Sequence, residues 1–391
     1  MSILRQLHLV LAIALLSSEL ETLEPDVIFV DQLSACIPFF RVLCSRAKVL
    51  FYCHYPDHLL VQPEKGTLRK ALKAIYRLPF DALEGWSTGC ADSVAVNSKY
   101  TRSVVRQTFT NLRQRELKVI YPCVDTRIDS APAPATQDLF PNKQILLSIN
   151  RFERKKNLAL ALKAYANLTR DEKSRALLVI AGGYDPRNPE NATTHTSLEN
   201  LASSLNLTHS TIRNPTSPSD LSTLDPSIQI IFLTSIPASL KTTLLHHASL
   251  LVYTPTNEHF GIVPLEAMLA RTPVLATNTG GPLETIYDGR TGWLRSPSRV
   301  DQWTEVMRKP LIASSRGNLA GMGEKGRERV LAEFGEAKMG AEIEREVLRL
   351  CGTRGGRPGV VPKGAGALVV MGGLAALAVL LGVWIAMAVR G

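Results

Sequence analysis

The sequence predicts an α/β protein of two halves, each built on a parallel β-sheet. Short apolar runs of strand length alternate with longer helical patterns, which is the arrangement of βαβ units. A stretch rich in Pro, Ala and Thr at 126–141 separates one such series from a second and is predicted to be a linker. With 391 residues and 45% hydrophobic content, the chain can form two or three domains, each with its own core.

The first half, residues 1–125, opens with an apolar segment at 3–16 that fits either a signal peptide or a core helix. We favour the helix, because export would expose the sequons at Asn167, Asn191 and Asn206 to glycosylation, and no other feature indicates an extracellular protein. Buried strands are predicted at 26–30, 48–52, 93–96 and 118–120.

The second half, residues 142–350, repeats the alternation. The polar stretch 184–197 shows no apolar period and is predicted to be an exposed loop. The predicted strands are 144–149, 176–180, 229–233, 250–253 and 273–276, and the predicted helices are 158–168, 265–270 and 323–333.

An uncharged stretch at 365–389 predicts a transmembrane helix, because it exceeds the roughly 20 residues that span a bilayer. A basic linker at 351–364 precedes it. Positive charge gathers on the cytosolic side of membrane proteins, so both halves are expected in the cytosol. A buried C-terminal helix is the alternative interpretation.

Charge and cysteine content narrow the classes of partner. The net charge of +10 suits phosphate-bearing substrates or an anionic membrane. No nucleic acid is expected, because the basic residues are dispersed and lack interleaved aromatic residues. The six cysteines form no CxxC pair and no Cys/His metal spacing, which is typical of reduced cysteines in a cytosolic protein.

The segment 254–268 carries the strongest chemical signal, since it follows a predicted strand and leads into a helix with proline in its first turn. The N–H groups of Gly261, Ile262 and Val263 are therefore expected at the positive end of that helix, where phosphate binds. Glu258 precedes the helix and Glu266 lies in its first turns, so both can face one ligand. The alternative is a pair of solvated carboxylates.

A second signal is the segment 150–157, which also lies between a strand and a helix. Arg151 and Lys156 are placed there to neutralise a leaving diphosphate, Arg as a fork and Lys as a point charge. The chain has no convincing Asp-x-Asp motif, so these cations are expected to replace a metal ion, and no cofactor is expected. Alternatively, both are ordinary surface charges.

These motifs resemble the signature of the family-4 retaining glycosyltransferases. The Glu-x7-Glu element of that family is matched by Glu258 and Glu266, and its Arg…Lys pair by Arg151 and Lys156. Within the family, the chain is most similar to the eukaryotic mannosyltransferases of lipid-linked oligosaccharide assembly, over 25–350. Further stretches that carry the resemblance are 51–57, 95–101, 280–284 and 289–293.

The resemblance implies the GT-B fold, in which two Rossmann-like domains face a cleft. Residues 1–125 would then be the acceptor-side domain and 142–350 the donor-binding domain. The implied donor is GDP-mannose, and the implied acceptor is a dolichol-diphosphate-linked chitobiose with one mannose, which receives mannose by α-1,3 and then α-1,6 linkage. The enzyme would lie at the endoplasmic reticulum membrane, facing the cytosol, beside other early mannosyltransferases.

The resemblance also implies residue roles. Glu258 would contact the transferred mannose, Glu266 the ribose, and Arg151 and Lys156 the diphosphate. His54 matches the family's cleft histidine and would hydrogen-bond the donor sugar. Retaining transfer then needs little external base, since the departing phosphate oxygen can accept the proton of the acceptor on the same face.

Some interpretations stay open. Gly280 and Gly281 either cradle the donor or only form a tight turn, and His54 is alternatively a structural histidine at a strand end. The family's first strand and Gly-rich turn are missing before Pro25. We therefore expect an incomplete first domain with an unpaired strand edge, exposed apolar surface, and weak or no activity.

Two other functions remain alternatives. The chain could be a family-4 transferase with a different donor, such as a UDP-sugar, or a different lipid acceptor. It could also be a truncated, non-catalytic membrane partner of other enzymes. A nicotinamide-dependent dehydrogenase is not expected, because no G-x-G-x-x-G follows a strand.

Overall fold

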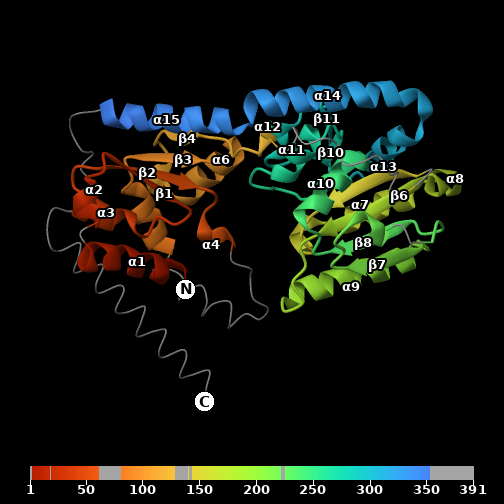
Figure 1. The fold of residues 1–391 in the computed structure, drawn as a ribbon, viewed down its shortest axis with the longest axis horizontal. Helices are drawn as coiled ribbons and strands as arrows, with labels where there is room; N and C mark the ends of the chain where they lie inside the picture. The colour runs from red at the N-terminus through yellow and green to blue at the C-terminus, as the bar shows by residue number, and fades with distance from the viewer. Residues whose placement is uncertain are drawn as a thin grey trace, which may run out of the picture. The chain divides into compact units, whose positions relative to one another are not determined.

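The computed structural model describes residues 2–17, 19–60, 81–127, 140, 143–221 and 225–352. The chain divides into two compact units, residues 1–120 with 342–391 and residues 121–341. Both are α/β, as the sequence predicts, and most of their elements are labelled in Figure 1. The sequence predicts that residues 342–350 belong to the second half, whereas they cluster with the first unit.

The first unit contains a parallel sheet whose described strands lie in the order β1-β2-β3-β4. Each predicted strand is confirmed to within one residue at each end, and so is the N-terminal helix. The strands are β1 (Val27–Asp31), β2 (Lys48–Cys53), β3 (Ser93–Val96) and β4 (Leu117–Val119). The helices are α1 (Ser2–Leu16), α2 (Glu19–Leu23), α3 (Ile37–Leu43), α4 (Asp57–Leu60), α6 (Lys99–Thr108) and one at 81–89.

Burial in the first unit differs strongly between strands. Residues 49–53 of β2 are all buried, as expected of an inner strand, and Val49, Phe51 and Cys53 pack in one core cluster. Strand β1 lies at an edge of the described sheet, and the Phe29 side chain on it is 44% exposed. The side chains of Leu16 and Leu23, on the adjoining helices, are exposed as well. The described core cluster of this unit centres on β2, β3 and the helices packed on them, and it includes one buried residue each from β1 and β4, Val30 and Leu117.

The second unit contains a larger parallel sheet, whose described strands lie in the order β11-β10-β9-β5-β6-β8-β7. The direction of strand addition reverses between β5 and β9, which are neighbours in the sheet. The strands are β5 (Gln144–Ile149), β6 (Ala176–Gly182), β7 (His209–Arg213), β8 (Ile230–Thr234), β9 (Ala248–Tyr253), β10 (Val274–Thr277) and β11 (Gly292–Arg295).

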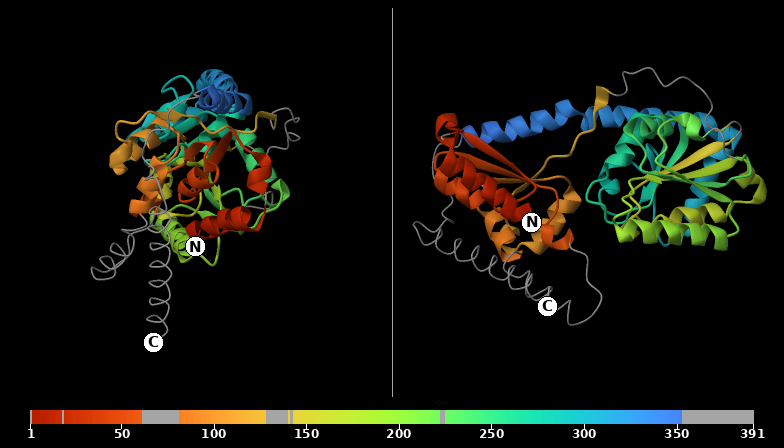
Figure 2. Two further views of the ribbon diagram at one scale, coloured as in Figure 1. Left: turned by 90° about the vertical axis from the view of Figure 1, so that its left-hand side faces the viewer. Right: turned by 60° about the horizontal axis from the view of Figure 1, so that its bottom comes forward.

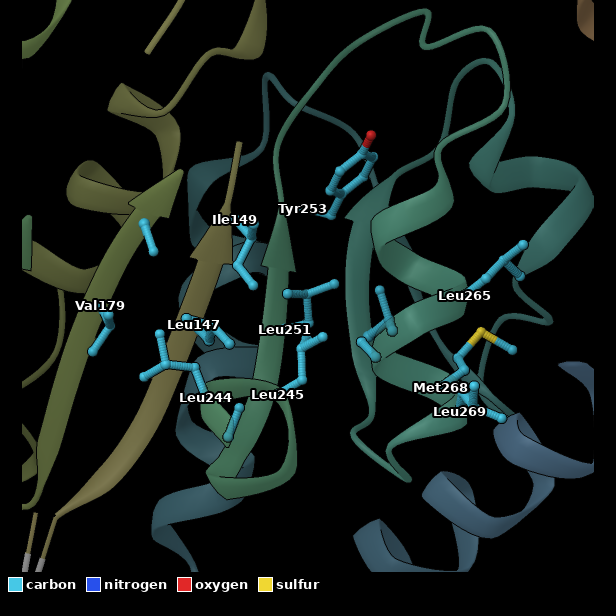
Figure 3. Packing of buried hydrophobic residues seen from close by; sticks show 14 of the residues in the cluster. Leu147, Ile149, Val179, Leu244, Leu245, Leu251, Tyr253, Leu265, Met268 and Leu269 are labelled. Carbon is cyan, nitrogen blue, oxygen red and sulfur yellow. The ribbon is translucent and has the colours of Figure 1, made fainter. Parts of the chain in front are cut away.

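Helices cover both faces of this sheet (Figure 2). Alternate strand residues point to opposite faces, so Leu147 and Leu146 belong to different core clusters. Figure 3 shows one cluster, in which Leu147 and Leu251 lie close to Leu244 of a covering helix, while Leu265 lies on another helix of the same cluster. The helices are α7 (Ala159–Ala166), α8 (Arg170–Ser174), α9 (Pro189–Ser204), α10 (Ala238–His247), α11 (Ile262–Leu269), α12 (Pro282–Thr285), α13 (Val300–Arg308) and α14 (Arg316–Glu333).

The prediction of an exposed loop at 184–197 is wrong, since most of this stretch lies in helix α9. Asn188 caps the helix by accepting a hydrogen bond from the Glu190 N–H, and Pro189 occupies its first turn. The inward face of the helix includes His195, a polar residue that interrupts the apolar period. The spacing of apolar residues is therefore too weak a signal to predict this helix.

Helix α15 (Glu336–Gly352) ends the described chain. Its second half belongs with the first unit, where the Ser93 hydroxyl donates to the buried Glu346 carboxylate at 2.5 Å. No helix in the described ranges is long and apolar enough to cross a membrane. Three predicted segments lie outside the described ranges. They are the membrane span 365–389, residues 353–364 of the basic linker, and most of the linker 126–141.

Candidate active site

Three loops of the second unit meet at the carboxyl ends of β5, β9 and β10. They are residues 150–157, 254–261 and 278–281. Because strand order reverses between β5 and β9, these loops border the switch point at which α/β sheets bind ligands. Figure 3 shows Ile149 and Tyr253 near the ends of these two neighbouring strands.

The first two loops are joined by an ion pair between predicted site residues. The Lys156 Nζ lies 2.6 Å from the Glu258 Oε2, and the Lys156 side chain is only 10% exposed. The Thr254 hydroxyl donates to the Lys156 carbonyl oxygen at 2.7 Å and fixes the backbone at the same point. A charge pair this close in a largely buried position holds both side chains in one geometry. The structure thus brings Lys156 and Glu258 together.

Arg151 lies on the same loop, with its side chain 62% exposed. Its Nη1 lies 3.0 Å from the Oε1 of Glu153, whose side chain is largely buried. The Lys155 ammonium lies 3.3 Å from the other oxygen of that carboxylate. Glu153 therefore orients the Arg151 guanidinium while leaving most of it open to solvent, where an anion can reach it.

Gly261 precedes helix α11 with a φ of 89°, a left-handed conformation that favours glycine. The next residues, Ile262 and Val263, begin the helix, so their N–H groups have no partner within it. The buried Tyr253 ring lies beside Gly261, where an added Cβ would come within 3.2 Å of its hydroxyl oxygen. Burial raises the pKa of the Tyr253 hydroxyl well above its usual range, and the Glu258 carboxylate adds to the effect. This hydroxyl is therefore protonated at neutral pH.

Gly280 and Gly281 pack directly against the loop that carries Glu258. The Gly281 N–H donates to the Glu258 carbonyl oxygen at 2.8 Å, and a Cβ on Gly281 would overlap the Phe260 carbonyl group. Gly280 has a φ of 68°, again left-handed. The glycine pair thus forms a tight turn that allows this close approach, and its predicted contact with the donor stays a prediction.

Glu266 has a different partner, the Lys241 ammonium, at 2.6 Å. The two side chains line a cavity of about 230 Å³ between α10 and α11, which Ile262 and Asp125 also border. The structure therefore does not pair Glu266 with the residues around Glu258. Each carboxylate of the Glu-x7-Glu element has a lysine of its own.

His54 lies in the first unit, at the end of β2. Its Nε2 is 2.8 Å from the Asp31 Oδ1 at the end of β1, and both side chains are about half exposed. The Tyr52 ring meets the imidazole edge-on, with centroids 5.0 Å apart. These contacts fix the orientation of His54, and its role toward a donor sugar stays a prediction.

Two family models match this chain. One, described as Glycosyltransferase Family 4, matches residues 2–128, and the other, Glycosyl transferases group 1, matches residues 132–329. The α-1,3/1,6-mannosyltransferase alg-2 of Neurospora crassa is 48% identical over 356 residues, which cover 89% of this chain and 74% of that protein. The human α-1,3/1,6-mannosyltransferase ALG2 is 40% identical over 353 residues, covering 88% and 77%.

The chain belongs to the α-1,3/1,6-mannosyltransferase family. The predicted family resemblance and enzyme class are thereby confirmed.

Solved structures establish the fold of the mannosyltransferase as GT-B, with two Rossmann-like domains. The trehalose 6-phosphate synthase of Burkholderia multivorans matches with a TM-score of 0.65 at 14% identity, covering 88% of this chain and 76% of that one. The Anabaena protein Alr3699/HepE in complex with UDP matches with a TM-score of 0.62 at 16% identity, covering 85% and 81%. At such low identity the likeness concerns the fold alone.

Sequence reasoning missed three residues at the site of the mannosyltransferase. Lys241 stands alone in a helical stretch, where no motif marks it. Glu153 lies within the recognised segment 150–157 but reads as one more charge among four cations. Tyr253 ends a strand and reads as core. The only signal available was that each predicted cation needs an acidic partner. Glu153 is the acidic residue nearest to Arg151 in the sequence.

Proposed function

We propose that this mannosyltransferase transfers mannose from GDP-mannose to a dolichol-diphosphate-linked chitobiose that carries one mannose, first by α-1,3 and then by α-1,6 linkage. The names of the relatives support the sugar and the two linkages. The observation that carries the donor site is the 2.6 Å pair between Lys156 and Glu258 at the sheet's switch point. Beside it lie the exposed Arg151 guanidinium and the first N–H groups of α11, which together suit a diphosphate.

In the proposed reaction, the bond between mannose C1 and the phosphate oxygen breaks, and its electron pair stays on that oxygen. The Lys156 ammonium and the Arg151 guanidinium stabilise the negative charge that develops there. The acceptor hydroxyl forms the new bond on the same face of C1 and gives its proton to the departing phosphate. Glu258 accepts hydrogen bonds from mannose hydroxyls and so orients the sugar. His54 hydrogen-bonds the donor sugar.

The same donor would place its ribose at Glu266. This carboxylate accepts hydrogen bonds from ribose hydroxyls, while Lys241 keeps it charged and oriented on the wall of the cavity between α10 and α11. Gly280 and Gly281 hold the loop of Glu258 against the donor, and no metal is required.

We place the enzyme at the endoplasmic reticulum membrane with its catalytic units in the cytosol, anchored by 365–389 beside other early mannosyltransferases. Two observations support the cytosolic side. All six cysteines lie in described positions, and none forms a disulfide there. The sequon residue Asn191 is 5% exposed, and its Nδ2 donates to the Phe152 carbonyl oxygen, so a glycan on that atom would break a buried bond.

The direct test is incubation of the full chain in membranes with labelled GDP-mannose or UDP-glucose and the chitobiose lipid bearing one mannose. Mass analysis of the lipid-linked glycans is expected to show one and two added hexoses with GDP-mannose only. Transfer from UDP-glucose instead would indicate a different family-4 activity.

Variants separate an enzyme from a non-catalytic partner. Glu258→Ala and Arg151→Ala are expected to abolish transfer. Arg299→Ala is a matched control, because Arg299 is 58% exposed and pairs with the acidic residue two positions on, as Arg151 does. If the first two variants support growth of a null strain as well as Arg299→Ala does, the protein acts without catalysis.

A further inference from the structure

The loop that carries Arg151 and Lys156 is fastened to the first turns of helix α9. Asn191 lies in the first turn, and its side chain is buried. Its Nδ2 donates to the Phe152 carbonyl oxygen at 3.0 Å, and its Oδ1 accepts from the Asp185 N–H at 3.0 Å. One amide thus joins the loop after β5 to the loop after β6, both of which border the ligand-binding end of the sheet.

Two neighbouring contacts reinforce this attachment. The Phe152 ring is fully buried and meets the His195 ring of α9 edge-on, with centroids 5.3 Å apart. The Glu190 Oε1 accepts a hydrogen bond from the Arg154 N–H at 3.2 Å. The loop is therefore held at its backbone on both sides of Glu153, the residue that orients Arg151.

Helix capping does not explain the bonds of Asn191. The cap of α9 is Asn188, whose side chain accepts from the Glu190 N–H within the helix. Both bonds of the Asn191 amide leave the helix and end on loops. Since a buried carbonyl without a partner is costly, removing this donor would favour other conformations of the loop at Phe152.

We infer that Asn191 is a positioning residue for diphosphate binding. By fixing Phe152, it sets the direction of the adjacent Arg151 side chain and the course of the chain to Lys156, so that both cations are in place before the donor arrives. Without it, donor binding has to order the loop, and this cost reduces affinity for the diphosphate. The inference rests on the proposed function, in which Arg151 and Lys156 hold the diphosphate.

The test compares the affinities of the full chain for GDP and GMP by calorimetry. Asn191→Ala is expected to weaken GDP binding about tenfold, and GMP binding by less than about threefold, because GMP lacks the terminal phosphate. Asn191→Asp keeps the acceptor for Asp185 but loses the donor to Phe152, so it is expected to weaken GDP binding at least as much. Thr304→Val is the matched control, since it removes a buried hydrogen bond from the Thr304 hydroxyl to the Ala164 carbonyl oxygen at 2.9 Å.

Arg151→Ala separates the two hypotheses. If it weakens GDP binding while both Asn191 variants bind GDP as the natural chain does, the inference about Asn191 is overturned and the proposed function stands. If Arg151→Ala also binds GDP normally, the proposed diphosphate site itself is wrong. An equal loss of GDP and GMP affinity in Asn191→Ala, with a lowered Tm, would show a merely structural role and overturn the inference too.

Discussion

The two units share one construction but differ in how firmly their strands are enclosed. In the second unit, β6 is buried along its whole length between two core clusters, one on each face of the sheet. In the first, the described core is a single cluster, and β1 leaves Phe29 44% exposed at the sheet edge. The charged site pair of Lys156 and Glu258 lies over the enclosed strands. The candidate site thus lies on the more enclosed of the two sheets, which is where a site gains the firmest support.

The largest effect is expected from a core truncation that tests this difference. Leu178→Ala in β6 removes a fully buried side chain and is expected to cost about 2–5 kcal/mol of unfolding free energy. Phe29→Ala in β1 is expected to cost less than about 1 kcal/mol, because its ring is half exposed. Hydrogen exchange of the backbone amides in each sheet measures the loss of stability in both variants. Equal losses of protection would contradict the comparison.

A second prediction compares two losses of activity: one on removing a charged group from the second unit, and one on removing a hydrogen-bonding group from the first. Lys156→Met removes the buried ammonium and is expected to lower kcat/KM for mannosyl transfer about 10²–10³-fold. His54→Ala removes a half-exposed imidazole and is expected to lower it only about tenfold. Initial rates at varied GDP-mannose give both values. A larger loss in the histidine variant would shift the main catalytic role to the first unit.

A third prediction concerns the glycine turn under the site. Gly281→Ala places a methyl group against the Phe260 carbonyl and is expected to destabilise the second unit by about 1–3 kcal/mol and to reduce transfer. Gly317→Ala in α14 meets open space and is expected to be neutral or to stabilise by up to about 1 kcal/mol. Thermal unfolding and transfer rates are the measurements. Normal activity in the first variant would contradict the close packing.

The smallest effect is a pH dependence of the second unit. Burial lowers the pKa of His195 below its usual 6.5, an effect that nearby Arg213 and His209 add to and Glu199 partly offsets. Because the folded state disfavours the proton, the neutral imidazole contributes stability above pH 6.5 that is lost as the pH falls below it, by at most about 1.4 kcal/mol per pH unit. Between pH 7.5 and 5, the free energy of unfolding from urea titrations is expected to fall less steeply for His195→Gln than for the natural chain. Parallel curves would exclude this role.

Strands that are buried on both faces could be predicted from the sequence, because they are unbroken apolar runs. Strand β5, for example, was predicted with its observed ends. Helix α9 could not, since the residues that it turns inward include Asn191 and His195. The edge strand β7, with its half-buried mixed sequence, was missed for a similar reason. The pattern of apolar and polar residues fails to predict an element where buried polar groups satisfy one another's hydrogen bonds.

The residues of the candidate site are easier to name from the sequence than the contacts between them. The predicted site residues Arg151, Lys156, Glu258 and Glu266 stand out in the sequence because they flank strands and a helix start. Their sequence spacing could not show that Lys156 pairs with Glu258 while Glu266 pairs with Lys241. Such pairings depend on strand order, which brings the ends of β5 and β9 together although a hundred residues separate them.

The 2.6 Å contact between Lys156 and Glu258 has a consequence for which anions the enzyme admits. Before the donor binds, the ammonium is already neutralised by an internal carboxylate. If the proposed diphosphate site is right, an incoming anion competes with that carboxylate for the ammonium, and a lone phosphate or sulfate offers the carboxylate no replacement hydrogen bonds. A sugar nucleotide does, because its sugar hydroxyls can take over the hydrogen bonds of the displaced carboxylate. In the proposed function, the pair would therefore favour a sugar nucleotide over inorganic phosphate or sulfate at the donor site.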